Sequence, residues 1–318
     1  MIEVKNLVKQ YGKKNAVDDV TFTVNKGEIL GFLGPNGAGK STTMNIITGY
    51  LSATSGSVTI DGHEILDDPI KAKSKIGYLP ELPPLYLDMT VKDYLDFVYD
   101  LNKVKIPRKQ HIDEICQLVK ITNVYNRLIR NLSKGYRQRV GIAQALIGNP
   151  DVLILDEPTV GLDPKQIIEI RNLIKELGKK HTVILSSHIL PEVQAICERV
   201  IVINEGKLVA DDTPDNLSKN MSADHKLMLR VDGPETEVYK TLIKIPNMVS
   251  VQTLGKKEEG TVYDYSVEAE KGTDIRREVF KRLAERNWPI LSMHTNELSL
   301  EDIFLQLTSG KKSNGGNH

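Results

Sequence analysis

A glycine-rich segment, Gly34-Pro35-Asn36-Gly37-Ala38-Gly39-Lys40-Ser41, constrains this chain of 318 residues more than any other feature. It fits the pattern GxxxxGK[ST] and lies between an apolar stretch over 28–33, which predicts a buried strand, and a stretch over 40–47, which predicts a helix. Its glycines let backbone N–H groups surround phosphate oxygens, and the helix N-terminus adds partial positive charge. The segment predicts an α/β fold with a nucleotide site, in which Lys40 reaches the β- and γ-phosphates and Ser41 binds Mg²⁺.

Two acidic residues, Asp156 and Glu157, directly follow an apolar run over 152–155. Such a run predicts a strand of a parallel sheet that is covered on both faces, and ligands of these sheets bind at the carboxyl ends of the strands. We therefore expect Asp156 to hold Mg²⁺ through water and Glu157 to accept a proton from an attacking water. The alternative is a solvated acidic pair at the end of a strand.

Two aromatic side chains are further candidates for the same site. His188 follows a predicted strand over 182–185, one strand–helix–strand unit after Glu157. It could contact the γ-phosphate. The alternative is a structural role, which is the usual one for a single histidine after a strand. Tyr11 precedes a glycine in a strand-to-turn stretch. It is either a half-buried aromatic residue or a residue that stacks on adenine.

A second place for an anion is predicted at the start of the helix over 134–148. Ser133 is a natural N-cap for this helix, and Gly135 lies in its first turn. A capped helix N-terminus presents free amides to an anion, whereas the alternative is a well-capped helix without a ligand. Because the chain already has one phosphate loop, a second anion site needs an explanation.

The periodicity of apolar residues changes along the chain and predicts its organisation. Alternation over 2–4 and 20–24 predicts antiparallel strands, and a period of 3.6 within about 88–150 predicts a helical insertion without strands. Further elements of a first domain, 1–215, are predicted as strands over 58–60, 152–155, 182–185, 200–203 and 208–210 and a helix over 164–177. A second domain, 224–309, has the order βαββαβ, typical of a ferredoxin-like sandwich. Its predicted elements are strands over 226–231, 249–254, 262–267 and 290–294, helices over 235–244 and 274–286, and a last helix over 299–307 before a disordered tail, 310–318.

The composition excludes several classes of protein. Lys and Arg together number 42, as do Asp and Glu, so the net charge is zero and argues against a general binder of nucleic acid or anionic membranes. Cys116 and Cys197 lie far apart, which excludes a disulfide scaffold and a cysteine-rich zinc site and predicts two small buried apolar residues. The sequence predicts no secretory signal, and no apolar run approaches the length of a membrane span.

The motifs and their order resemble those of the ATP-binding subunits of ABC transporters, from about Met1 to Asp211. They are GPNGAGKS (34–41), LSKGYRQR (132–139), LILDEP (153–158), GLDP (161–164) and SSH (186–188). The resemblance implies a P-loop NTPase fold of the ABC type, with an antiparallel β subdomain and the helical insertion. In that family two ATPase subunits face each other head to tail, and each ATP lies between the phosphate loop of one and the signature helix of the other.

The resemblance assigns roles to individual residues. Glu157 matches the general base, His188 the switch histidine, and Asp163 the D-loop that communicates across the dimer. The residues implied to bind ATP are Tyr11, Gly34, Pro35, Asn36, Gly37, Ala38, Gly39, Lys40, Ser41 and Thr42. The residues implied to bind the ATP of the partner subunit are Ser133, Lys134, Gly135 and Tyr136, and those implied to hold Mg²⁺ are Ser41, Glu81 and Asp156.

Two departures from the family pattern are visible. The usual signature is LSGGQ, and here Lys134 and Tyr136 replace its second glycine and its glutamine. Glu81 replaces a glutamine that normally contacts Mg²⁺; a carboxylate can still bind the ion but changes the charge there. Together with segments 83–86, 89–91 and 298–304, these variants resemble the ABC-2 type exporter ATPases, including the gliding-motility-associated kind.

We therefore expect an ATP- and Mg²⁺-dependent ATPase subunit that drives substrate movement, in the direction of export, through a separate membrane permease. It would lie at the cytoplasmic face of the membrane as a peripheral protein, paired with an identical or paralogous ATPase subunit, and bind no nucleic acid. The permease would dock near 81–91. The alternative is a non-transport ABC ATPase. A ribosomal one usually has two ATPase cores in one chain, and a DNA-repair one needs a long coiled coil. The second domain is either a ligand sensor or a structural, dimer-stabilising appendage.

Overall fold

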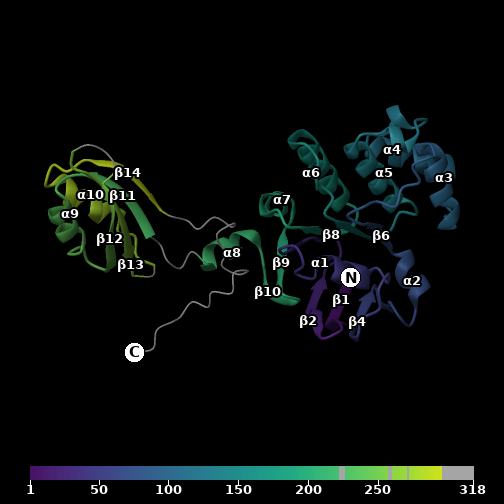
Figure 1. Ribbon diagram of the computed structural model, residues 1–318, viewed down its shortest axis with the longest axis horizontal. Helices are drawn as coiled ribbons and strands as arrows, with labels where there is room; N and C mark the ends of the chain where they lie inside the picture. The colour runs from purple at the N-terminus through teal and green to yellow at the C-terminus, as the bar shows by residue number, and fades with distance from the viewer. Residues whose placement is uncertain (222–225, 257–259, 271, 296–318) are drawn as a thin grey trace. The chain divides into compact units, whose positions relative to one another are not determined.

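The computed structural model describes residues 1–318 except 222–225, 257–259, 271 and 296–318 (Figure 1). Contacts between residues divide the chain into two compact units, which meet in the sequence at Pro214 and Asp215. The predicted helix over 299–307 and the predicted tail over 310–318 lie outside the described residues.

The first unit contains two sheets (Figure 1). An antiparallel sheet has the order β2-β1-β4-β5, with β1 Ile2–Tyr11, β2 Lys14–Val24, β4 Ser55–Ile60 and β5 His63–Glu64. A six-stranded sheet has the order β10-β9-β3-β8-β7-β6, with β3 Ile29–Leu33, β6 Ile76–Leu79, β7 Val152–Asp156, β8 Thr182–Ser187, β9 Arg199–Asn204 and β10 Lys207–Asp212. Its pairs are parallel except β9 with β10. The carboxyl ends of β3, β7 and β8 therefore meet at one edge.

In the described part of the chain, three helices of the first unit begin at a residue whose side chain accepts a hydrogen bond from the first turn. Thr90 accepts a hydrogen bond from the amide of Asp93 at the start of α3, and Asp163 with Pro164 begins α6. The helices are α1 Lys40–Ile47, α2 Pro69–Ser74, α3 Val91–Leu101, α4 Arg108–Leu118, α5 Lys134–Leu146, α6 Pro164–Gly178 and α7 Leu190–Ile196, with short 3₁₀ turns at Thr122–Val124 and Ile129–Asn131. Helices α3, α4 and α5 lie in the predicted helical insertion.

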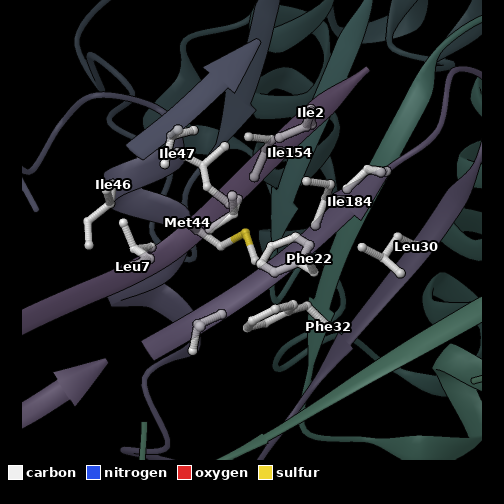
Figure 2. Close-up of a cluster of buried hydrophobic side chains, with 14 of the residues drawn as sticks. Ile2, Leu7, Phe22, Leu30, Phe32, Met44, Ile46, Ile47, Ile154 and Ile184 are labelled. Carbon is white, nitrogen blue, oxygen red and sulfur yellow. The ribbon is translucent and has the colours of Figure 1, made fainter. Parts of the chain in front are cut away.

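A single hydrophobic cluster joins the two sheets of this unit through α1. Met44 of α1 lies beside Phe22 of β2, and Ile154 of β7 and Ile184 of β8 belong to the same cluster (Figure 2). Met44, Ile154 and Ile184 have no exposed surface. Because α1 is held on both sides, the phosphate loop that precedes it is fixed above the end of β3.

Strand β6 and helix α7 were not predicted. Gly77 lies within β6, and glycine weakens the strand pattern. The structure supplies the reason for the glycine: a Cβ at Gly77 would lie 2.0 Å from the carbonyl oxygen of Ala145, so α5 packs directly on the strand. Helix α7 has seven residues, too few to display a helical period.

The second unit confirms the predicted ferredoxin-like topology. Its strands β11 Lys226–Asp232, β12 Met248–Lys256, β13 Val262–Ala269 and β14 Ile290–Thr295 form an antiparallel sheet of order β12-β13-β11-β14. The helices of this unit are α9 Glu235–Leu242 and α10 Arg276–Ala284, and α8 Pro214–Met221 spans the division between the units. Leu229, Val231 and Tyr265 of the sheet share a core with Val238 of α9 and Leu283 of α10.

Both cysteines are buried and free, as predicted. Burial raises the pKa of the Cys116 thiol to about 11, so it stays protonated at neutral pH. Within the residues that the structure describes, no helix has the length and apolar character required to cross a membrane.

Candidate functional site

The phosphate loop is shaped by glycines in backbone conformations that other residues rarely adopt. Gly37 has φ 79° and Gly39, the N-cap of α1, has φ 109°. A Cβ at Gly39 would lie 2.4 Å from the carbonyl oxygen of Ala16, so a larger residue would force the loop away from β2. The loop borders a pocket of about 500 Å³, lined by Ala16, Asn36, Gly37, Gly39, Lys40, Ser41, Thr42, Glu81, Glu157, Val160 and His188.

The ammonium group of Lys40 lies at the base of this pocket. Its Nζ donates to the carbonyl oxygen of Gly34 at 2.8 Å and lies 3.4 Å from Oε1 of Glu157. The side chains of Lys40 and Glu157 are each 6% exposed, so the pair is shielded from bulk water. Removal of either charge would leave the other buried with fewer partners.

Glu157 is held between two neighbours and has an unusual backbone conformation. Its Oε2 lies 2.8 Å from Nδ1 of His188, while its Oε1 faces Lys40. Its φ is 49°, in the left-handed region that non-glycine residues seldom occupy. Its amide donates to the carbonyl oxygen of Ser186 at 3.2 Å and to the hydroxyl of Ser186 at 3.0 Å. A carboxylate oriented in this way, at the wall of the pocket, can accept a proton from a water molecule.

The predicted metal ligands supply oxygen atoms at one side of the pocket. Ser41 and Glu81 line it, and both also line a neighbouring cavity together with Asp156. The hydroxyl of Ser186 donates to Oδ1 of Asp156. Among the described residues no group of three or more His, Cys, Asp or Glu side chains forms a metal cage. A hydroxyl with one or two carboxylates nevertheless suits Mg²⁺, which takes its remaining ligands from phosphates and water.

Tyr78 borders the same place. Its hydroxyl donates to Oδ1 of Asn45 at 3.1 Å. Burial, followed by the charges of Asp156 and Glu81, raises the pKa of this phenol well above its usual range. Tyr78 therefore stays neutral at physiological pH and acts as a hydrogen-bond donor.

The predicted second anion site is a separate pocket. Ser133 caps α5 by accepting a hydrogen bond from the amide of Tyr136 at 3.4 Å. The pocket measures about 260 Å³ and is lined by Lys120, Ser133, Gly135, Tyr136, Arg139, Gln166 and Glu169. Its lining shares no residue with the pocket around Lys40. The first unit thus has two separate pockets, each at the N-terminus of a helix.

Lys134 and Asp163 lie beside this second pocket rather than in its lining. A Cβ at Gly161 would lie 2.1 Å from Nζ of Lys134, so the ammonium group covers the segment that precedes α6. Asp163 caps α6 by accepting from the amide of Gln166 at 2.9 Å. Lys134 therefore lies against Gly161 of its own chain, which the sequence did not suggest.

Tyr11 does not line the nucleotide pocket. It ends β1, is 52% exposed, and has Nζ of Lys9 5.4 Å from its ring centroid. Ala16 and Val160 do line the pocket and were not predicted. Small apolar side chains have no chemical signature in a sequence, so only the folded chain identifies them.

Comparisons with known proteins agree with this geometry. A family model described as ABC transporter matches residues 17–160. The chain is 34% identical over 316 residues to the linearmycin resistance ATP-binding protein LnrL of Bacillus subtilis (strain 168), covering 97% of this chain and 98% of the relative. It is 33% identical over 312 residues to the bacitracin transport ATP-binding protein BcrA of Bacillus licheniformis, covering 98% of each.

Solved structures give the same result over about two thirds of the chain. The dimeric structure of a bacterial ABC transporter cassette is similar with a TM-score of 0.62 and 28% identity, over 67% of this chain and 98% of that one. A post-hydrolysis dimer of the cassette bound to ADP and Pi is similar with a TM-score of 0.61, 28% identity and the same coverage, 67% and 98%. Because sequence identity extends over nearly the full length of two relatives, the chain belongs to the ATP-binding subunits of ABC transporters, which hydrolyse ATP and work as dimers with membrane permeases.

Proposed function

We propose that this chain hydrolyses ATP in sites shared between two ATPase subunits arranged head to tail, and thereby drives export through a separate permease. The observation that supports this most is the presence of two separate pockets in one unit. One contains the phosphate loop, Lys40 and a candidate base, and the other has a helix N-terminus with Ser133 and Gly135, while the carboxylate in its lining, Glu169, is already paired with Arg139 at 2.6 Å. Each pocket supplies what the other lacks, as a head-to-tail pair requires.

The chemistry follows from the groups around Glu157. The amides of the phosphate loop and Lys40 bind the β- and γ-phosphates, and Glu157 accepts a proton from the attacking water. His188, 2.8 Å from Glu157, orients that carboxylate and contacts the γ-phosphate. Mg²⁺, when bound, neutralises phosphate charge, and Ser41, Asp156 and Glu81 would hold it. ATP contacts both subunits only in the closed dimer, so loss of the γ-phosphate allows the dimer to open.

The permease is proposed to dock in the cavity that adjoins the nucleotide pocket. This cavity measures about 760 Å³ and includes an aromatic cluster in which the ring centroid of Tyr86 lies 6.0 Å from Tyr94 and 5.4 Å from Phe97. Leu82 and Leu101 at its edge are 81% and 65% exposed. Exposed apolar surface of this kind is typical of a protein–protein interface. Because Glu81 lines both this cavity and the nucleotide pocket, movement in one can reach the other.

The direction of transport and the location are inferred from relatives. Those relatives include a bacitracin transport protein and a lipopolysaccharide export protein, the second 36% identical over 222 residues. These names favour export over an activity on ribosomes or DNA. We infer a peripheral subunit at the cytoplasmic face of the membrane, paired with an identical or paralogous subunit.

Mixing two inactive variants tests the head-to-tail arrangement. Lys40→Ala removes the phosphate-binding cation, and Ser133→Asp keeps a helix cap but repels the partner's γ-phosphate. Each variant alone is expected to be inactive in a phosphate-release assay. A one-to-one mixture is expected to recover about a quarter of wild-type activity, because half the dimers are mixed and each mixed dimer has one intact site. A mixture no more active than the two variants separately would contradict a shared site between identical subunits.

A charge in the apolar cavity tests the docking of the permease. Leu101→Glu is expected to reduce recovery of the chain with cell membranes at least about 10-fold, since an unpaired carboxylate would be buried at the interface. ATP turnover of the purified chain should stay within about two-fold, because surface substitutions rarely alter the fold. Leu66→Glu is the control, because Leu66 is 54% exposed and lies outside the cavity lining. Equal membrane recovery of both variants would refute this docking site.

A further inference from the structure

Glu192 is a buried carboxylate with no role so far. It lies in the first turn of α7, after His188, and is 3% exposed. Its Oε2 accepts hydrogen bonds from the hydroxyl of Thr159 at 2.5 Å and from the hydroxyl of Ser187 at 3.5 Å. A carboxylate taken out of water is costly, and neutral hydroxyls compensate for only part of that cost. A residue of this kind at this place needs an explanation beyond packing.

The hydrogen-bond donors of Glu192 belong to the two segments that form the candidate catalytic pair. Thr159 follows Glu157 after one proline, and Ser187 immediately precedes His188. Besides the hydrogen bonds that Ser186 forms with Asp156 and the amide of Glu157, side chains join these two segments at two further places. The first connection is Glu157 to His188 at 2.8 Å, at the wall of the pocket. The second is Thr159 to Glu192 at 2.5 Å, beneath it.

The second connection is shielded and acts on a strained segment. Thr159 is 3% exposed and Ser187 has no exposed surface, so water does not compete for these hydrogen bonds. Glu157 has φ 49°, a conformation that persists only where the surroundings hold it. The amide of Ile189 also donates to the hydroxyl of Ser187 at 3.0 Å, which fixes the turn after His188.

We propose that Glu192 is a positioning residue that holds Glu157 and His188 in the geometry needed for proton transfer. The carboxylate accepts the hydrogen bond from the hydroxyl of Thr159 at 2.5 Å, at the short end of the range for such bonds. Without it, the segment after Glu157 can relax its backbone, and the carboxylate moves relative to the attacking water. Displacement by about 1 Å can lower a reaction rate about 100-fold. The inference rests on the proposed role of Glu157 as the general base.

Steady-state kinetics of full-length variants test the proposal. Glu192→Ala and Thr159→Val are each expected to lower kcat about 10-fold or more, because the catalytic pair loses its support. The KM for ATP and the affinity for ATP should stay within about two-fold, because the phosphate loop is untouched. Thr159→Ser and Glu192→Gln keep a donor and an acceptor, so each is expected to retain at least about a third of wild-type kcat. The control is Glu198→Ala, an exposed carboxylate just beyond α7, with unchanged kinetics.

A double-mutant cycle separates positioning from general destabilisation. The double variant Thr159→Val/Glu192→Ala is expected to be no slower than the slower single variant, because Glu192→Ala already removes the hydrogen bond that Thr159→Val removes. Multiplicative losses, unchanged kcat in folded Glu192→Ala, or loss of ATP affinity in parallel with kcat would overturn the proposal. If Glu192→Ala does not fold, the kcat of Thr159→Val is compared with that of Thr159→Ser. The proposal then requires that only Thr159→Ser retains most of the wild-type kcat. Glu157→Gln in the same assay distinguishes failure of the base assignment from failure of this inference.

Discussion

Replacement of Glu157 by glutamine is expected to lower ATP turnover about 1000-fold, within the range that general bases contribute. Glutamine keeps the size of the side chain but cannot accept the proton of the attacking water. ATP should still bind, because Lys40 and the loop amides are intact and one negative charge beside the phosphates is removed. With binding retained and hydrolysis blocked, ATP should hold the two subunits together. Phosphate release measures turnover, and light scattering with ATP measures the dimer.

The matched control for this change is Asp151→Asn. Asp151 immediately precedes β7 and forms an ion pair with Lys75 at 2.7 Å, whereas Glu157 follows the carboxyl end of the same strand. Asp151 is 49% exposed, so the loss of its charge should change turnover less than about two-fold. Near-normal hydrolysis by Glu157→Gln would show that another group takes the proton.

Lys40→Ala is expected to weaken ATP binding about 100-fold, since a hydrogen bond to a charged group contributes about 1.5–3 kcal/mol. The ammonium group is already oriented, because the carbonyl oxygen of Gly34 accepts a hydrogen bond from it at 2.8 Å. The ammonium group also lies 3.4 Å from the carboxylate of Glu157. Without it, the negative charge of this buried carboxylate is no longer balanced and repels the phosphates. Both effects oppose the binding of a triphosphate.

Calorimetric titration with ATP measures this affinity, and Lys71→Ala is the control. Lys71 is 66% exposed and pairs with Asp68 at 2.7 Å on the surface, so its removal should leave ATP affinity within about two-fold. ATP affinity of Lys40→Ala within about three-fold of the wild type would contradict the assigned role of Lys40. Folding of the variant is verified by a cooperative thermal transition in the absence of ATP, with a lower midpoint because Glu157 loses its buried partner.

Much of the fold was predictable because each element displays a local pattern. The five residues of β7 are all buried, as its apolar run predicted. The predicted order βαββαβ of the second unit is the order of its observed elements, and Leu227, Leu229 and Val231 of its first strand lie in the core. The strands and helices that were missed lacked such a pattern. Gly77 interrupts β6 because α5 packs against its backbone, and that contact is invisible in the sequence.

The candidate site, like the fold, has residues that the sequence predicted and contacts that it did not. Lys40, Asp156 and Glu157 were found because the phosphate loop and an acidic strand end have recognisable chemistry. Lys134 was grouped with the signature residues, and its position against Gly161 of its own chain was not predicted. Tyr11 was assigned to adenine, yet it does not line the nucleotide pocket. These positions depend on how loops pack against one another, which spacing along the chain does not encode.

The chemical groups of this protein can be recognised along its sequence: a loop for phosphates, a strand that ends in acidic residues, and a capped helix with free amides. Which of these groups meet depends on the folded chain. The sheet order places β8 between β3 and β7, so Lys40 after β3, Glu157 after β7 and His188 after β8 lie at one edge. It also brings Glu192 under Thr159. The physical reason is that the spacing of apolar residues along the sequence predicts only which face of one helix or strand is buried. Contacts between distant elements follow from the order of the strands and from close packing.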